Sequence, residues 1–271
     1  MILRSPIRSI AFFTVYTAAM SIGLNAAPPA PVDSAVWCDS LIKGEIKRSC
    51  GRGHDNRKPP CALAVRLKRF ADWLEEKEKP CSTMINDVAE RSATLRDTGR
   101  YSIDTSLVTF VGAPAAPVRI VMYVSASCPL CKRIYHDLYD SVTTGPLKGK
   151  ARLGIKPFSS KPWDVALLAS RTFGKQSELL RSLANVSERI SLAIILQKAD
   201  SLGIPRKEFE KAIVDERIKD AADGSYREAV RNGVSLTPTL FIDNHRYKSY
   251  KDPRWVVDAA EYFHEREQTK R

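Results

Sequence analysis

Short apolar runs separated by turn-forming residues dominate the chain from residue 98 onwards. Runs of about four to eight apolar or alternating residues between turn signals are typical of β-strands. Glycine and prolines mark one turn at 112–117, and Asp243-Asn244 favours a tight turn between two strands. The predicted strands are 106–111, 118–124, 151–157, 239–242 and a return strand that begins near Tyr247.

Between these strands, apolar residues recur every three or four positions, which is typical of amphipathic helices. One helix is expected to begin at Pro129 or Leu130, directly after a strand, and the last is expected to follow Asp252 as its cap. The predicted helices are 129–139, 163–173, 177–199, 207–220, 225–231 and 253–267. This order of elements predicts an α/β fold whose sheet is interrupted by a helical insertion at about residues 160–232.

A different, helical pattern fills residues 33–97, where we expect helices at 34–47, 63–78 and 84–95. The segment 63–78 carries its apolar residues on one face among Lys, Arg and Glu, and Pro80 ends it. The region also holds Cys38, Cys50, Cys61 and Cys81, four of the six cysteines. We expect a helical hairpin stapled by disulfides, because so small a unit does not hold a core by itself.

The pairing of these four cysteines is open, because four cysteines allow three connectivities and the sequence does not choose between them. Two antiparallel helices would bring Cys38 near Cys81 and Cys50 near Cys61, so geometry favours this nested pairing. The alternative is a metal site that uses Cys50, His54 and Cys61. It lacks the close Cys-x-x-Cys pairs of structural zinc sites, so we expect no metal.

The first 26 residues have the pattern of a secretory signal peptide. Two arginines precede an uncharged apolar run at 10–23, and Ala26 and Ala27 follow it. The run is shorter than the about 20 apolar residues of a membrane span, and a retained N-terminal anchor is the alternative. Export predicts a bacterial periplasmic protein, in a compartment where disulfides persist. The predicted organisation is a signal peptide at 1–26, a helical four-cysteine region at 27–97 and an α/β domain at 98–271.

Composition and charge narrow the class of protein. The 271 residues are 44% hydrophobic and 27% charged, which excludes a mainly disordered or multi-span membrane protein. The formal net charge is +12, but it forms no basic block with interleaved aromatic residues. We therefore do not expect nucleic-acid binding, whereas attraction to anionic membrane surfaces or acidic clients stays open.

The strongest chemical signal is the motif Cys128-Pro129-Leu130-Cys131, which directly follows the strand 118–124 and opens a helix. A cysteine at a helix N-terminus faces unpaired N–H groups and the positive end of the helix dipole, which favour the reactive thiolate. Cys131 lies three residues further on, where it can attack a mixed disulfide formed by Cys128. The alternatives are a structural disulfide or half of a zinc site, and no second pair of close ligands supports zinc.

A second signal is Pro238 at the start of the strand 239–242, within the run Leu236-Thr237-Pro238-Thr239. Proline is disfavoured inside strands but tolerated at a first or edge position, so an ordinary strand-entry proline is the alternative explanation. Together, a Cys-Pro-x-Cys motif after an apolar strand and a Thr-Pro-Thr motif before the last hairpin resemble the thioredoxin fold. Over residues 100–271 the chain most resembles the DsbA-type branch of exported thiol–disulfide oxidoreductases, which carries a helical insertion between the two motifs.

The resemblance implies a role for each matching residue. Cys128 matches the exposed nucleophile and Cys131 the buried resolving thiol. Pro238 matches a cis-proline that faces the disulfide, and the backbone at Thr237 would pair with an extended substrate segment. The resemblance implies no cofactor.

Two positions depart from the DsbA pattern. Leu130, next to Pro129 in the motif, occupies the position where DsbA has a histidine. A histidine there would help to stabilise the Cys128 thiolate, and leucine does not. Met122 stands where many family members carry a buried glutamate, so a proton acceptor for Cys131 is in doubt. We therefore expect a milder oxidant than DsbA, with an isomerase or a reductase as the alternatives. Lys132 and Arg133 would add positive charge near the motif, but such residues are usually solvated.

The sequence therefore predicts an enzyme that exchanges disulfides with protein or peptide thiols through Cys128 and Cys131. A membrane partner would reset it, either a quinone-linked oxidase of the DsbB or vitamin-K-epoxide-reductase type or a DsbD-like reductase. The alternatives are a client-specific reductase, or a binding module or chaperone in which the Cys128–Cys131 bond is structural and residues 33–97 form the docking surface. The direction of electron flow does not follow from the sequence.

Overall fold

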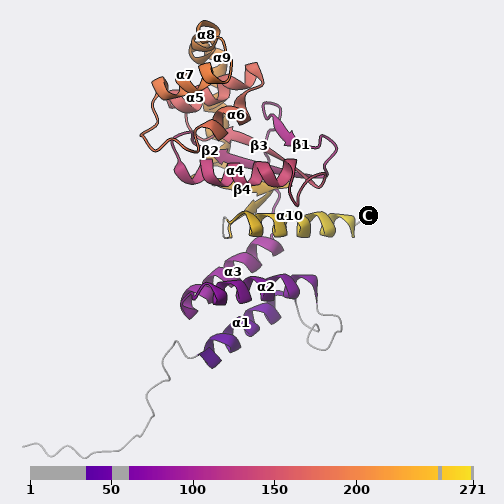
Figure 1. The fold of residues 1–271 in the computed structure, drawn as a ribbon. Helices are drawn as coiled ribbons and strands as arrows, with labels where there is room; N and C mark the ends of the chain where they lie inside the picture. The colour runs from indigo at the N-terminus through magenta and orange to yellow at the C-terminus, as the bar shows by residue number, and fades with distance from the viewer. Residues whose placement is uncertain (1–34, 51–60, 250–251, 270–271) are drawn as a thin grey trace, which may run out of the picture.

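The structure is a computed structural model that describes residues 35–50, 61–249 and 252–269. A five-stranded sheet in the order β1-β3-β2-β4-β5 lies in the middle of the molecule, between the N-terminal helices and the helices of the insertion (Figure 1). The predicted α/β fold with a helical insertion and a helical N-terminal region is confirmed. The strands are β1 Phe110–Gly112, β2 Val118–Val124, β3 Ala151–Pro157, β4 Thr239–Ile242 and β5 His245–Tyr247.

Strand β2 is at the centre of the sheet, where it pairs parallel to β3 and antiparallel to β4. Six of its seven residues are buried, which explains its nearly continuous apolar sequence. Tyr123 lies opposite Thr239, so the last residues of β2 and the first residue of β4 meet at the same end of the sheet. The segments that follow β2 and precede β4 are therefore neighbours in space.

The predicted tight turn between β4 and β5 is confirmed. Asp243 and Asn244 have φ angles of 46° and 65°, in the left-handed region that two-residue hairpin turns require. The Asp243 carboxylate also accepts a hydrogen bond from the backbone N–H of Arg119, at 2.8 Å. This contact ties the hairpin to the start of β2.

Helices cover both faces of the sheet. Alternate residues of β2, such as Ile120 and Met122, pack with buried residues of α4 and α10, whereas Tyr123 packs with Ala229 of α9 on the other face. Asp252 caps α10 as predicted, with its carboxylate accepting from the N–H of Arg254 at 2.9 Å. These helices are α4 Pro129–Thr143, α5 Pro162–Ala169, a 3-10 turn Ser170–Phe173, α6 Gln176–Ser182, α7 Leu192–Ser201, α8 Arg206–Val214, α9 Glu216–Arg231 and α10 Pro253–Gln268.

One predicted strand and one predicted helix were wrong in extent. The strand predicted at 106–111 begins only at Phe110, because a turn precedes it in which Val108 N donates to Thr105 O at 3.0 Å. The helix predicted at 177–199 is broken into α6 and α7, since Ser191 caps a new helix by accepting from Ile194 N. Polar cap residues of this kind compete with helix continuation, which apolar periodicity does not reveal.

The boundary between α8 and α9 was also misplaced. The helix predicted at 207–220 ends at Val214, and Asp215 caps α9 by accepting from Arg217 N at 2.9 Å. Helix α9 then runs without a break through Gly224, where the sequence predicted a separate helix at 225–231. Isolated glycine inside a helix costs only about 1 kcal/mol, which packing offsets here.

The N-terminal region consists of α1 Ala35–Ser49, α2 Ala62–Glu76 and α3 Cys81–Arg96. Cys38 is bonded to Cys81 and Cys50 to Cys61, which is the nested pairing that geometry favoured. Cys81 opens α3 rather than following α2, because Pro80 is the residue before the helix. His54 and the predicted signal peptide lie outside the described residues.

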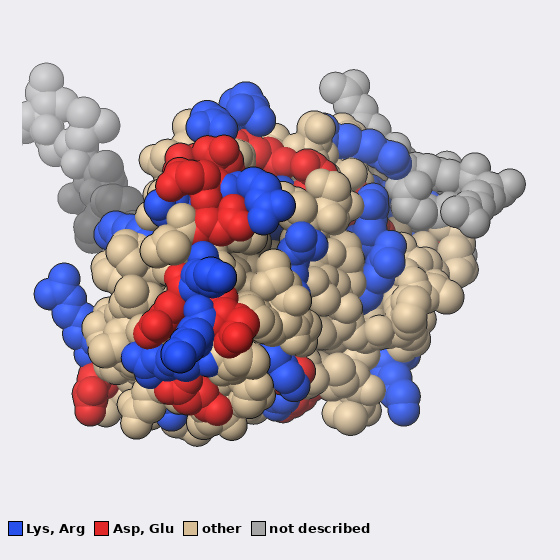
Figure 2. Space-filling view, turned by 90° about the horizontal axis from the view of Figure 1, so that it is seen from above, with Lys and Arg blue, Asp and Glu red and all other residues tan. Residues whose placement is uncertain are grey.

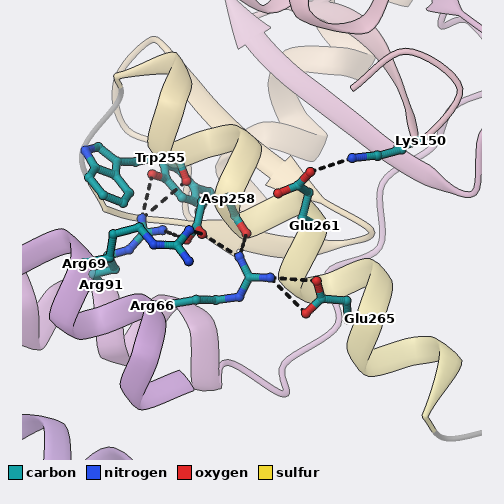
Figure 3. A network of polar contacts seen from close by, with 9 residues as sticks. Arg66, Arg69, Arg91, Lys150, Trp255, Asp258, Glu261 and Glu265 are labelled. Atoms are coloured by element: carbon teal, nitrogen blue, oxygen red, sulfur yellow. Dashed lines mark hydrogen bonds and ion pairs between the residues drawn. The ribbon is translucent and has the colours of Figure 1, made fainter. Parts of the chain in front are cut away.

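The N-terminal helices pack against α10, which lies between them and most of the sheet (Figure 1), and α3 also contacts β5 directly. Asp258 of α10 is buried and accepts from Arg66 Nη1 at 2.5 Å and from Arg91 Nη2 (Figure 3). The guanidinium of Arg91 is fully buried and lies 4.9 Å from the ring of Phe70 and 4.8 Å from the ring of Trp255. Charge pairing and aromatic packing therefore join the region to the rest of the chain.

The surface over the insertion carries both signs of charge, intermixed rather than separated (Figure 2). Ion pairs on this part of the chain include Arg206 with Asp200 and Lys219 with Glu216, each at 2.8 Å. This face therefore offers no single-sign patch. In the part of the chain that the structure describes, no helix is both long and apolar enough to cross a membrane.

Candidate active site

Cys128 is the N-cap residue of α4, at the point where the chain leaves β2 and enters the helix. Its sulfur accepts a hydrogen bond from the backbone N–H of Cys131 at 3.2 Å. Both cysteines are free thiols; Cys128 is partly exposed, whereas Cys131 is fully buried. The motif therefore presents one accessible sulfur at the positive end of a helix and keeps the other behind it.

The structure shifts the pKa values of the two thiols in opposite directions. The pKa of Cys128 is lowered to about 6, chiefly by a hydrogen bond from the Cys131 thiol and also by the N–H of Cys131, while partial burial opposes the shift. Burial raises the pKa of Cys131, and the neighbouring Cys128 raises it further. At neutral pH the thiolate is therefore on Cys128, the sulfur that solvent can reach.

The loop before β4 faces this sulfur. The Thr237–Pro238 peptide bond is cis, and the Cys128 sulfur lies 3.6 Å from the carbonyl oxygen of Thr237, to which it donates only when it is protonated. Thr239 fixes the loop, because its hydroxyl donates to the carbonyl of Leu236 at 2.7 Å. The structure thus brings together Cys128, Cys131, Thr237 and Pro238, the residues that the sequence assigned to one site. The four remaining cysteines are bonded within the N-terminal helices.

The positions expected to tune the site are apolar. Pro129 is the first residue of α4, and Leu130 is 38% exposed beside the motif. Met122 is fully buried in β2, and its thioether is no proton acceptor for Cys131. Leu236, on the opposing loop, is 57% exposed. An exposed leucine therefore lies beside each of the two motifs, the Cys-Pro-x-Cys motif and the Thr-Pro-Thr motif.

Asp164 is a site residue that sequence reasoning missed. It lies in the first turn of α5, is fully buried, and accepts from Ala126 N at 2.7 Å and Ser125 Oγ at 3.1 Å, as well as from Ser159. Burial raises its pKa, and these hydrogen bonds oppose the shift. An acidic residue in a first helical turn is common, so nothing in the sequence marked it. It fixes the loop that leads from β2 to Cys128.

The prediction that Lys132 is solvated is wrong. The residue is 4% exposed, and its Nζ donates to the carbonyl of Val186, in the segment between α6 and α7, at 3.3 Å. Burial lowers its pKa, and the Cys128 thiolate raises it. Arg133, the next residue, is exposed as expected. The insertion covers Lys132, which the helical pattern of α4 alone does not predict.

The chain belongs to the thioredoxin family, since a family model described as Thioredoxin matches residues 104–259, more than half of its length. Within the described residues, no group of three or more His, Cys, Asp or Glu side chains forms a metal site. Among curated proteins, none matches.

Three solved structures have a similar fold. A thioredoxin-like oxidoreductase from Silicibacter pomeroyi DSS-3 is 18% identical, with a TM-score of 0.53 over 65% of this chain and 98% of that one. BdbD from Bacillus subtilis is 14% identical, with a TM-score of 0.53 over 63% and 100%. The catalytic domain of Proteus mirabilis ScsC is 15% identical, with a TM-score of 0.51 over 66% and 98%.

By family the protein is therefore a thioredoxin, and its fold is that of these three solved structures. The three structures leave about a third of this chain without a counterpart. That share is about the size of the part before residue 98. We propose that the boundary of the thioredoxin-like domain falls there.

Proposed function

We propose that this protein is an exported thiol–disulfide oxidoreductase that exchanges disulfides with other exported proteins through Cys128 and Cys131. One observation carries the proposal: a partly exposed Cys128 with a pKa of about 6 lies beside a buried thiol, Cys131, at the N-terminus of α4. A structural cysteine pair needs neither an acidic nor an accessible sulfur.

Disulfide transfer at this site takes two steps. A client thiolate attacks Cys128 Sγ of the Cys128–Cys131 disulfide, and Cys131 leaves as a thiolate that takes up a proton. The second client thiolate then attacks the client sulfur of the mixed disulfide, and Cys128 leaves as a thiolate. The client loses two electrons and the protein gains them. A leaving thiol of low pKa departs faster, which favours Cys128 in this second step.

Client segments bind at the loop that carries Thr237 and Pro238. An extended segment adds beside the backbone at Thr237, so main-chain hydrogen bonds give affinity with little demand on client sequence. The Thr237 carbonyl already lies 3.6 Å from Cys128 Sγ, which places a bound client sulfur next to the nucleophile. Leu130 and Leu236 provide apolar contact on either side.

The proposed protein is a milder oxidant than DsbA. Leu130 neither carries a charge nor donates a hydrogen bond to the Cys128 thiolate, and Met122 offers no proton acceptor for Cys131. The reduced form is therefore less favoured than in DsbA. A membrane oxidase of the DsbB or vitamin-K-epoxide-reductase type would keep the protein oxidised, and a DsbD-like partner would keep it reduced.

The proposed location is the bacterial periplasm, with residues 1–26 as the signal peptide that directs export or, as the alternative, as a retained anchor. The two disulfides of the N-terminal region support an oxidising compartment. Periplasmic fractionation of cells that express the full chain tests this location.

The test of the function compares Cys128→Ser with Cys131→Ser, each with its active-site cysteine reduced, using an unfolded client protein whose two cysteines are joined by a disulfide that the Cys128 thiolate can attack. We expect Cys128→Ser to abolish exchange and Cys131→Ser to accumulate a mixed disulfide with the client, resolved by mass spectrometry. Both variants keep the four N-terminal cysteines, so any exchange through those cysteines would remain in both. Exchange at the wild-type rate in Cys128→Ser would instead support the binding-module function.

A further inference from the structure

Lys132 is a buried cation one helical turn after the nucleophile. Its backbone N–H donates to the carbonyl of Cys128 at 3.2 Å, and residues four apart on a helix share a face. Side chains on a helix lean towards its N-terminus, which in α4 is the end that carries Cys128. Lys132 as a residue is 4% exposed. Its ammonium therefore lies on the side of α4 that carries Cys128 and interacts electrostatically with that sulfur, with little screening by water.

The ammonium of Lys132 has one hydrogen-bond acceptor, the neutral carbonyl of Val186 at 3.3 Å. Within residues 35–50, 61–249 and 252–269, no carboxylate forms an ion pair with it. Lys156, which is also buried, has Glu228 at 2.8 Å as its counter-ion. A buried charge is costly unless it is paired. The negative charge available to Lys132 is the thiolate of Cys128.

Asp164 of α5 is buried beside the motif, but its carboxylate is occupied by hydrogen bonds from Ala126, Ser125 and Ser159. The other charged groups on the elements around Lys132 face solvent. On α4, Arg133 is exposed and the side chain of His136 is 44% exposed. In the segment that covers Lys132, Glu188 and Arg189 are exposed. The loop at 233–238 contains no charged residue. Water screens the exposed charges, so their effect on Cys128 is small.

We propose that Lys132 is a positioning residue that acts through Cys128: its buried ammonium stabilises the thiolate of the reduced protein and thereby favours reduction of the Cys128–Cys131 disulfide. This inference rests on the proposed function and deepens it. In the reduced protein, cation and thiolate neutralise each other. In the oxidised protein, the disulfide is neutral and the cation stays buried without a counter-ion. Lys132 thus makes the protein more oxidising than it would be without this charge, and partly offsets the lack of a histidine at position 130.

The redox step balances with a client dithiol as the reductant. The client loses two electrons and two protons as its disulfide forms. The two electrons break the Cys128–Cys131 bond, one proton goes to Cys131, and the other is released to solvent because Cys128 stays a thiolate. Lys132 holds its proton throughout and changes only the stability of that thiolate.

The test compares Lys132→Met, which keeps the apolar stem and removes the charge, with Arg133→Met, which removes the same charge from the exposed neighbour. We expect Lys132→Met to raise the pKa of Cys128 by about one unit, measured by thiolate absorbance. At pH 7 the equilibrium constant for oxidising glutathione should then fall about fivefold, or about 20 mV for a two-electron couple. Arg133→Met should leave both values within experimental error.

Lys132→Arg keeps the charge and should restore both values to within about twofold of the wild type. Equal effects of Lys132→Met and Arg133→Met, or no effect of either, would overturn the proposal. Should Lys132→Met fail to fold, NMR titration of the wild-type Lys132 ammonium decides, because its pKa must be lower in the oxidised than in the reduced protein. Identical values in the two states would refute the role of Lys132, whereas failure of the wild type to exchange thiols would refute the proposed function instead.

Discussion

Cys128 and Cys131 carry the same side chain three residues apart, yet the fold lowers the pKa of the first and raises the pKa of the second. Cys128 receives hydrogen bonds at the N-terminus of α4, and Cys131 is buried among apolar residues. This difference assigns the attacking and resolving roles, because the thiolate is the nucleophile and the exposed thiolate meets the client first.

The first prediction concerns pH. Because the pKa of Cys128 is about 6, its alkylation by iodoacetamide in the reduced native protein should rise with pH around a midpoint of about 6. At pH 7 roughly 90% of Cys128 should be thiolate. Peptide mass mapping checks the site, and Cys131 should stay unmodified until the protein unfolds. A midpoint above about 8 would contradict the assignment, since that is the range of an ordinary thiol.

The second prediction concerns Leu130. Replacing it with histidine supplies a hydrogen-bond donor and, when protonated, a charge at the N-terminus of α4. Leu130→His should therefore raise the reduction potential, by about 30 mV for each tenfold gain in the equilibrium constant. The control is Leu107→His, a similarly exposed leucine before β1, at 41% against 38%. An unchanged potential in Leu130→His would show that this position does not tune the site.

At the scale of elements, the insertion completes the site. Asp164 of α5 accepts hydrogen bonds from the loop that enters α4, and the carbonyl of Val186 accepts from Lys132. Both contacts run from the insertion to the segment around Cys128. The insertion is therefore part of the active-site support.

The third prediction tests this support. Asp164→Ala removes the acceptor of the Ala126 N–H and leaves that buried donor unsatisfied, which should lower the free energy of unfolding by about 2–3 kcal/mol. Asp164→Asn keeps a side-chain oxygen for Ala126 and should cost about 1 kcal/mol or less. Urea unfolding of the reduced protein measures both. Wild-type stability in Asp164→Ala would mean that the loop does not depend on this carboxylate.

The sequence predicted best those elements whose pattern is set by burial alone. The strands β2, β3 and β4 begin and end where their apolar runs do. The two motifs could be assigned to one site because parallel and antiparallel pairing around β2 brings their segments together. The cap at Ser191 was missed because apolar periodicity does not reveal a local side-chain cap. The burial of Lys132 and Asp164 was missed because it depends on how the insertion packs against the segment around Cys128.

At the scale of the whole molecule, the N-terminal region is fixed to the thioredoxin-like part through α10. Asp258 of α10 lies between Arg66 of α2 and Arg91 of α3 (Figure 3). Arg91 is fully buried, so its charge depends on Asp258 for compensation. Removing one member of a buried ion pair costs about 3–5 kcal/mol, because the other charge stays buried.

The fourth prediction follows from this contact. Asp258→Ala should lower the free energy of unfolding by about 3–5 kcal/mol, measured by urea unfolding with tryptophan fluorescence. The control is Glu261→Gln, one turn further along α10, whose more exposed pair with Lys150 at 2.7 Å should contribute less than about 1 kcal/mol. Equal effects of the two variants would show that the buried contact does not join the two regions.

The measurement that tests the central claim most directly is the redox equilibrium of the purified wild-type protein with glutathione. Thiols are trapped with a mass tag and assigned by peptide mapping. We predict that Cys128 and Cys131 change state together as one two-electron couple, at a potential more negative than the about −120 mV of DsbA, while the Cys38–Cys81 and Cys50–Cys61 bonds stay intact. If Cys128 reacts only after denaturation, the protein is not a thiol–disulfide oxidoreductase.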